Sequence, residues 1–186
     1  PIKVFILAGQ SNMQGHGRIA MGKDGDLNDA ASQEQFAYLK KDGKWAERDD
    51  VWYFHKSGKG AVIKGNLKPG QGANEKSIGP ELAFGHVMGD YFDEQVLLIK
   101  TAWGGQAIAM TFRPPSSGSL KDEVLQPLFE RAKKKNPKLT LPQFRELFGS
   151  RYRQVLSEVH DTLHNLKEHF PAYEGQGYEI AGFFWH

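Results

Sequence analysis

The sequence has no cysteine among its 186 residues. This absence excludes a disulfide framework, a metal site built from thiolates and a cysteine nucleophile. Long apolar runs are missing as well: stretches such as residues 4–8 and 183–185 have the length of strands, far below the roughly 20 residues of a membrane-spanning helix. We therefore expect no membrane partner, and a nucleophile, if there is one, of another residue type.

Charge of one sign is not in excess either. The chain carries 24 basic and 22 acidic side chains, mixed along its length, for a net charge of +2. This balance argues against the basic face of a nucleic-acid-binding protein and against a disordered acidic tail. The hydrophobic content of 39% is enough for a core, and the length predicts a single domain over residues 1–186.

Three apolar, β-branched segments are typical of strands buried within a sheet: residues 2–8, 96–101 and 180–185. Between the second and the third, apolar side chains recur in one stripe over residues 150–170, which predicts an amphipathic helix. A further helix is expected to begin near Pro80, because proline suits the first helical position and Glu81 places an acid in the first turn. The helix dipole explains such an acid, and contact of Glu81 with the turn at Ser11 is the functional alternative.

This alternation predicts an α/β fold, a three-layer α/β/α sandwich with a central parallel sheet and right-handed crossovers. Two stretches fall outside that pattern. Residues 15–76 are rich in Gly, Asp, Lys and Asn and are expected to form an insertion lying over the sheet edge. Residues 114–149 contain a Pro-Pro-Ser-Ser-Gly segment and a Lys-rich segment, and predict a second insertion with a helix on each side of residues 133–137.

The ends of the predicted strands carry the residues of chemical interest, since ligands of open parallel sheets bind at the carboxyl ends of the strands. The first strand runs into Gly9 and then Ser11, a tight turn that would expose a hydroxyl beside unpaired backbone N–H groups. The alternative is an ordinary serine at a helix N-cap. The second strand ends at Gly104 and Gly105, where the backbone could approach a ligand, or form a plain turn.

Five blocks of sequence carry a family resemblance. In order along the chain they read FILAGQSNMQG from Phe5, SIGPELAFG from Ser77, LIKTAWGG from Leu98, RPPSSG from Arg113 and AGFFWH from Ala181. Together they resemble SGNH-type carbohydrate acetylesterases, in particular the sialate O-acetylesterase-like branch. The resemblance implies a flavodoxin-like SGNH hydrolase fold, an acetylated carbohydrate as substrate, no cofactor and no metal. We also expect a secreted or periplasmic location; any signal peptide is absent from a sequence that begins at Pro1.

The resemblance also implies roles for single residues. The nucleophile of the family falls on Ser11, which would form an acetyl ester, and the N–H groups of Ser11 and Gly104 would stabilise the oxyanion. Further residues are candidates for the substrate pocket: Gln10, Asn12, Gly105, Arg113 and His186. For Arg113, contact with a carboxylate or with sugar hydroxyls and a structural salt bridge remain equal alternatives. His16 is expected at the pocket rim or in the insertion.

The sequence departs from the family pattern at its end. In the family, a glutamine that donates to the oxyanion and an Asp-x-x-His motif that supplies the base follow the Trp-His segment, whereas this sequence stops at His186. We therefore expect the N-terminal part of a longer hydrolase, with the triad His and Asp, the C-terminal strands and a helix beyond residue 186. The 186 residues alone would then be nearly inactive, because an unactivated serine is a weak nucleophile. The alternative is a non-catalytic carbohydrate-binding or truncated module on the same fold.

Overall fold

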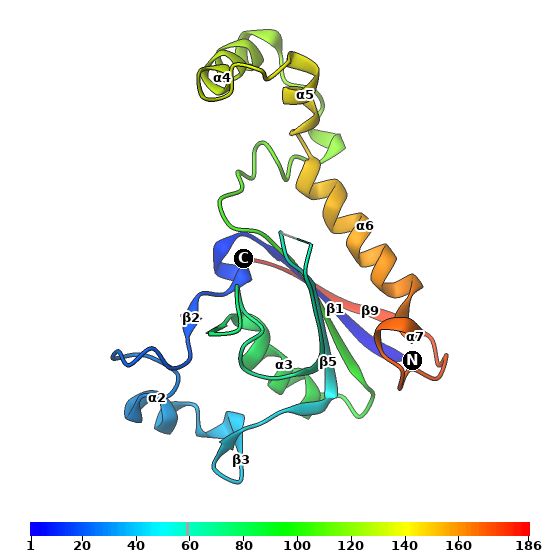
Figure 1. The fold of residues 1–186 in the computed structure, drawn as a ribbon. Coiled ribbons are helices and arrows are strands. Elements are labelled where there is room, and N and C mark those ends of the chain that lie inside the picture. The colour runs from blue at the N-terminus through cyan, green and yellow to red at the C-terminus, as the bar shows by residue number, and fades with distance from the viewer. Residues whose placement is uncertain (59) are drawn as a thin grey trace. The chain divides into compact units, whose positions relative to one another are not determined.

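The computed structural model describes residues 1–58 and 60–186 (Figure 1). The chain divides into two compact units. Unit 1 comprises Pro1–Gly105 and Glu158–His186, and unit 2 comprises Gln106–Ser157. Within the described residues, no helix is long and apolar enough to cross a membrane.

A mostly parallel sheet forms the centre of unit 1. Its strand order is β6-β5-β8-β1-β9. The bounds of these strands are β1 Ile2–Gly9, β5 Arg48–Lys56, β6 Val62–Leu67, β8 Val96–Ala102 and β9 Tyr178–Trp185. β1 pairs in parallel with both β8 and β9, and β5 pairs in parallel with β8, whereas β6 is antiparallel to β5. The three strands expected from the sequence are therefore confirmed and lie side by side, but β9 is at the edge and largely exposed rather than buried.

The expectation that residues 15–76 form an insertion lying over the sheet edge needs a correction. Residues 48–56 and 62–67 are strands of the sheet itself, and β5 is the direct neighbour of β8. The reason is the apolar run from Val51 to Phe54, which is buried together with His55. A strand of this kind is stable only inside a sheet that is covered on both faces.

Apolar side chains alternate between the two faces of the sheet and form a core on each. On one face, Phe5, Leu7 and Leu98 pack with Leu82 of helix α3, Pro80–Tyr91. On the other face lie side chains from the strands and from the helical segment after residue 158: Val4, Trp52, Ile99, Val159, Leu163, Leu166 and Phe170. These helices and the sheet make the three layers of an α/β sandwich, as the sequence predicts.

The remaining elements of unit 1 are short. They are α1 Ser11–Gln14, β2 Gly17–Arg18, α2 Ala30–Gln35, η1 Ala37–Leu39, β3 Lys40–Lys41, β4 Lys44–Trp45, β7 Ser77–Ile78 and α7 Leu166–His169. The helix predicted over residues 150–170 is divided in two, α6 Ser150–His164 and α7. The division falls at Asn165, whose side-chain amide donates to the carbonyl of Asp161 and whose backbone leaves the helical region.

Unit 2 has an apolar core of its own. It contains η2 Pro115–Ser117, α4 Asp122–Lys135, α5 Leu141–Glu146 and the start of α6. Leu125, Phe129 and Phe144 are buried together and bring α4 and α5 into contact. Two helices are present as expected, but α4 runs through Lys135, so the break between them falls at residues 136–140 and not at 133–137. A capping box between Thr140 and Gln143 fixes the start of α5.

β9 is an edge strand. Among the described residues it pairs with β1 alone, and its aromatic side chains are widely exposed, 56% for Phe183 and 43% for Trp185. Edge strands of this length with exposed apolar side chains are templates for pairing with another segment or chain.

Candidate active site

Ser11 lies at the carboxyl end of β1, between the ends of β8 and β9. β1 ends at Gly9, and Ser11 opens the single helical turn α1 and is exposed. The turn is closed by two backbone hydrogen bonds, from the Gln14 N–H to the Gln10 carbonyl at 2.8 Å and from the Gly15 N–H to the Ser11 carbonyl at 3.0 Å. A serine in this place presents its hydroxyl outward on a rigid support.

Gly9 makes this turn possible because no other residue fits there. Its φ is +154°, and a Cβ added to it would lie 2.0 Å from the carbonyl oxygen of His186. The His186 backbone continues the pairing of β9 with β1 past Gly9: its N–H donates to the Ala8 carbonyl and its carbonyl accepts from the Gln10 N–H, both at 3.1 Å. The close approach of these two backbone segments thus fixes where β1 ends and the Ser11 turn begins.

We expect Gly9→Ala to lower the free energy of unfolding by about 3 kcal/mol, because the added methyl overpacks against backbone and strains φ. Urea denaturation followed by circular dichroism measures this. Gly43→Ala is the matched control: Gly43 also has a positive φ, of +74°, but a Cβ there meets nothing within 4 Å. Its cost should be about 1 kcal/mol. Equal losses at the two positions would contradict the steric argument.

Gly104 lies beside Ser11, as the sequence analysis anticipates for the ends of neighbouring strands. A Cβ added to Gly104 would lie 3.6 Å from the Ser11 Cβ. The Trp103 N–H donates to the Gly9 carbonyl at 3.2 Å and ties the end of β8 to the end of β1. The structure therefore brings the two residues together, with Gly105 following at a positive φ of +71°.

The Gly104 N–H already has an acceptor, which nothing in the sequence predicts. It donates to the side-chain oxygen Oε1 of Gln14 at 3.1 Å. A carbonyl oxygen thus occupies the direction in which Gly104 would donate to an oxyanion. If Gly104 acts in this way, the Gln14 side chain must move aside first.

Ser11 shares a cavity of about 480 Å³ with two histidines. The cavity is lined by Ser11, Asn12, Gly15, His16, Gly17, Ile78, Gly79 and His186. Among the described residues, no histidine is hydrogen-bonded to the Ser11 hydroxyl, and no group of three or more His, Cys, Asp and Glu side chains could hold a metal ion. Gln10 precedes Ser11 and is half-buried. Arg113 belongs to unit 2, where it lines a different cavity.

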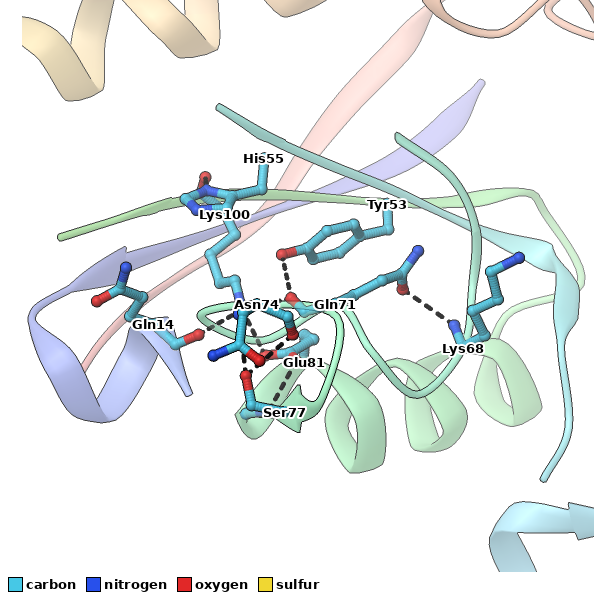
Figure 2. Close-up of polar contacts among 10 residues, drawn as sticks. Gln14, Tyr53, His55, Lys68, Gln71, Asn74, Ser77, Glu81 and Lys100 are labelled. Atoms are coloured by element: carbon cyan, nitrogen blue, oxygen red, sulfur yellow. Dashed lines mark hydrogen bonds and ion pairs between the residues drawn. The ribbon is translucent and has the colours of Figure 1, made fainter. Parts of the chain in front are cut away.

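Below the Ser11 turn lies a fully buried ion pair, Lys100 with Glu81 (Figure 2). The Lys100 ammonium donates to Glu81 Oε2 at 2.8 Å and to the backbone carbonyls of Gln14 and Gln71 at 3.0 Å each. The other Glu81 oxygen accepts from the Gly79 N–H at 2.7 Å. One cation therefore joins the last residue of α1, the loop at Gln71 and the start of α3.

Lys100 is not among the residues singled out from the sequence, and it is Lys100 that links Glu81 to the Ser11 turn. The available signal was a lysine inside the otherwise apolar strand 96–101, since lysine is almost never fully buried without a partner. Burial lowers the pKa of Lys100, and the carboxylate of Glu81 opposes that shift. Burial also raises the pKa of Tyr53 well above its usual value, and its hydroxyl donates to the Gln71 carbonyl at 2.7 Å.

His55 is buried on β5, opposite Lys100 of β8. Its Nδ1 lies 2.7 Å from the Lys100 carbonyl oxygen, so Nδ1 carries the proton and donates. Burial lowers its pKa from 6.5 to about 4, and the positive charge of Lys100 acts in the same direction. The imidazole is therefore neutral in the folded protein at neutral pH.

This shift predicts a pH dependence of stability. Between pH 6.5 and 4 the unfolded chain binds a proton at His55 that the folded chain does not, so stability is complete above pH 6.5 and falls as the pH drops. The loss at this one group amounts to about 3 kcal/mol by pH 4. Urea unfolding at pH 7 and pH 4.5 measures it. His55→Asn keeps a donor for the Lys100 carbonyl and should reduce the pH dependence, whereas His164→Asn, at an exposed position, should leave it unchanged.

Comparison with known proteins shows the family. A family model described as carbohydrate esterase, sialic acid-specific acetylesterase, matches residues 1–144. The chain belongs to this family, and the resemblance drawn from its five sequence blocks is confirmed. No curated protein matches it.

One solved structure similar to the chain is a protein from Arabidopsis thaliana determined by X-ray crystallography. The sequences are 16% identical and the TM-score is 0.42. The alignment covers 100% of this chain and 57% of that protein, so the chain spans little more than half of its length.

Proposed function

We propose that the chain carries the nucleophile of a serine esterase that removes O-acetyl groups from carbohydrates. The observation that supports it most directly is the place of Ser11: exposed at the carboxyl end of β1, in a cavity, with the Gly104 backbone beside it. Membership of a carbohydrate esterase family supports the class of reaction.

In the proposed reaction, Ser11 Oγ attacks the acetyl carbonyl carbon while a base takes its proton. The N–H groups of Ser11 and Gly104 stabilise the tetrahedral oxyanion, after the Gln14 side chain has left the Gly104 N–H. The bond from carbon to the sugar oxygen breaks, the sugar leaves with a proton, and acetyl-Ser11 remains. Water then releases acetate and restores the hydroxyl.

We assign His16 and His186 to the wall of the cavity rather than to the role of base. Both line it with Ser11, yet neither is hydrogen-bonded to the hydroxyl. The base in this proposal is a histidine of the Asp-x-x-His type that the resemblance implies. The candidate substrates are acetylated sialic acid and acetylated plant or algal polysaccharides. In this proposal the enzyme needs no cofactor and acts in a secreted or periplasmic location.

A carbohydrate-binding module without catalysis is the second candidate. The observation that favours it is the missing hydrogen bond between Ser11 and a histidine within the described residues. A fluorophosphonate probe separates the two, because it reacts only with an activated serine. We expect the full-length protein to be labelled at Ser11 alone, as read by peptide mapping, and to release acetate from an acetylated sugar. Labelling of another serine would assign the role of nucleophile to that serine instead of Ser11. Saturable sugar binding without labelling would favour the binding module.

A further inference from the structure

Unit 2 contains a cavity of about 550 Å³ that is built from its own residues. The cavity is as large as those that hold small organic ligands, roughly 300–1,000 Å³. The charged side chains that line it are three arginines, Arg113, Arg145 and Arg153, and one acid, Asp122. Positive charge is therefore in excess around this cavity, although the whole chain is close to neutral.

The three arginines are held in place by the fold but retain donors. The Arg113 Nε and Nη2 donate to the carbonyls of Gly118 and Ser117, and Arg153 donates from both Nη atoms to the carbonyls of Phe148 and Glu146. Two of the arginines also form ion pairs with acids at exposed positions: Arg145 Nη2 lies 3.4 Å from Asp122 Oδ1, and Arg153 Nη2 lies 3.6 Å from Glu146 Oε2. A guanidinium carries five N–H donors, so each of these side chains can donate further hydrogen bonds to a ligand.

The rest of the lining suits the other parts of a sugar acid. Phe148 and Tyr152 are half-buried, and together with Pro114 they provide apolar surface against which a sugar ring can pack. The Asp122 side chain is 77% exposed, and its carboxylate can accept hydrogen bonds from hydroxyl groups. The cavity thus combines positively charged guanidinium groups, a hydrogen-bond acceptor and an apolar surface for a sugar ring.

We propose that unit 2 binds a saccharide that bears a carboxylate. Arg145 and Arg153 hold the carboxylate, because the planar fork of a guanidinium matches its two oxygens. Asp122 accepts from the sugar hydroxyls, and the ring lies against Phe148 and Tyr152. The choice of a saccharide rests on the proposed function, but the binding itself requires no step at Ser11.

Isothermal titration calorimetry at low ionic strength tests this, with the full chain and D-glucuronate as the probe. D-glucose, which lacks the carboxylate, and acetate, which lacks the ring, are the comparison ligands. We expect saturable binding of glucuronate at one site, and affinities at least tenfold lower for glucose and for acetate. Acetate bound as tightly as glucuronate would overturn the saccharide part, and glucose bound as tightly would overturn the carboxylate part.

Variants locate the site. Arg145→Ala is expected to weaken glucuronate binding about tenfold or more, and Arg145→Lys should also weaken it because a lysine keeps the charge but loses the fork. Lys134→Ala removes the same charge from an exposed position of α4 outside the cavity and should leave the affinity unchanged. Equal weakening by Arg145→Ala and Lys134→Ala would overturn the proposal in favour of general electrostatic attraction.

Two controls keep the outcomes distinct. Arg145 is 56% exposed, so Arg145→Ala should fold, which circular dichroism checks. Ser11→Ala should bind glucuronate like the parent protein. Loss of acetate release with intact glucuronate binding would leave this inference standing, and active enzyme that binds no glucuronate would refute it while leaving the esterase proposal in place.

Discussion

Ser11→Ala is expected to abolish acetate release from acetylated sugars by the full-length protein, with a fall in turnover of about 10⁴-fold or more. Every step after substrate binding passes through the acetyl ester of Ser11 in the proposed mechanism. The fold should not suffer, because Ser11 is exposed and its hydroxyl has no hydrogen-bond partner among the described residues. Acetate release measures the activity, and urea denaturation measures the stability.

His16→Gln is the matched control for this variant. His16 lines the same cavity but is assigned to its wall, so its replacement should lower turnover less than about tenfold, whereas loss of a general base costs about 10²-fold or more. A loss as large as that of Ser11→Ala would make His16 the base. Undiminished acetate release by Ser11→Ala would overturn the serine mechanism itself.

Lys100→Met should have the largest effect on stability, a loss of about 3–5 kcal/mol in the free energy of unfolding. Methionine has a similar length, so little packing is lost, but the Glu81 carboxylate and the carbonyls of Gln14 and Gln71 would lose their shared donor. A buried carboxylate without its cation is the main cost. Urea unfolding measures this loss.

Two further variants test the cause. Lys56→Met changes an exposed lysine at the end of β5 and should alter stability by less than about 0.5 kcal/mol. Adding Glu81→Gln to Lys100→Met removes the uncompensated charge while keeping an oxygen for the Gly79 N–H, so the double variant should be more stable than the single one. A double variant less stable than Lys100→Met would contradict a charge-based explanation.

The network also bears on the site, because Lys100 holds the carbonyl of Gln14, the last residue of the Ser11 turn. Gln14 in turn accepts from the Gly104 N–H. The buried ion pair therefore holds the turn that carries Ser11, while the Gln14 side chain of the same turn contacts Gly104.

The sequence by itself determined the elements whose evidence is local. The strands at residues 2–8, 96–101 and 180–185 follow from apolar runs bounded by glycine or by the chain end, although only the first two are buried. The family follows from ordered sequence blocks, four of which lie within the matched residues 1–144. The proximity of Ser11 and Gly104 could also be anticipated, because the carboxyl ends of adjacent parallel strands meet at one edge of the sheet.

The tertiary structure alone decided which residues far apart in the chain meet. The sequence places β5 in an insertion because the segments that flank it along the chain are polar. Only its pairing with β8 shows that it is a strand of the sheet. The sequence gives no sign that Glu81 pairs with Lys100, because their pairing depends on α3 packing over β8. Spacing along the sequence reports which side chains are buried, whereas the partner of a buried charge is fixed by contacts across the core.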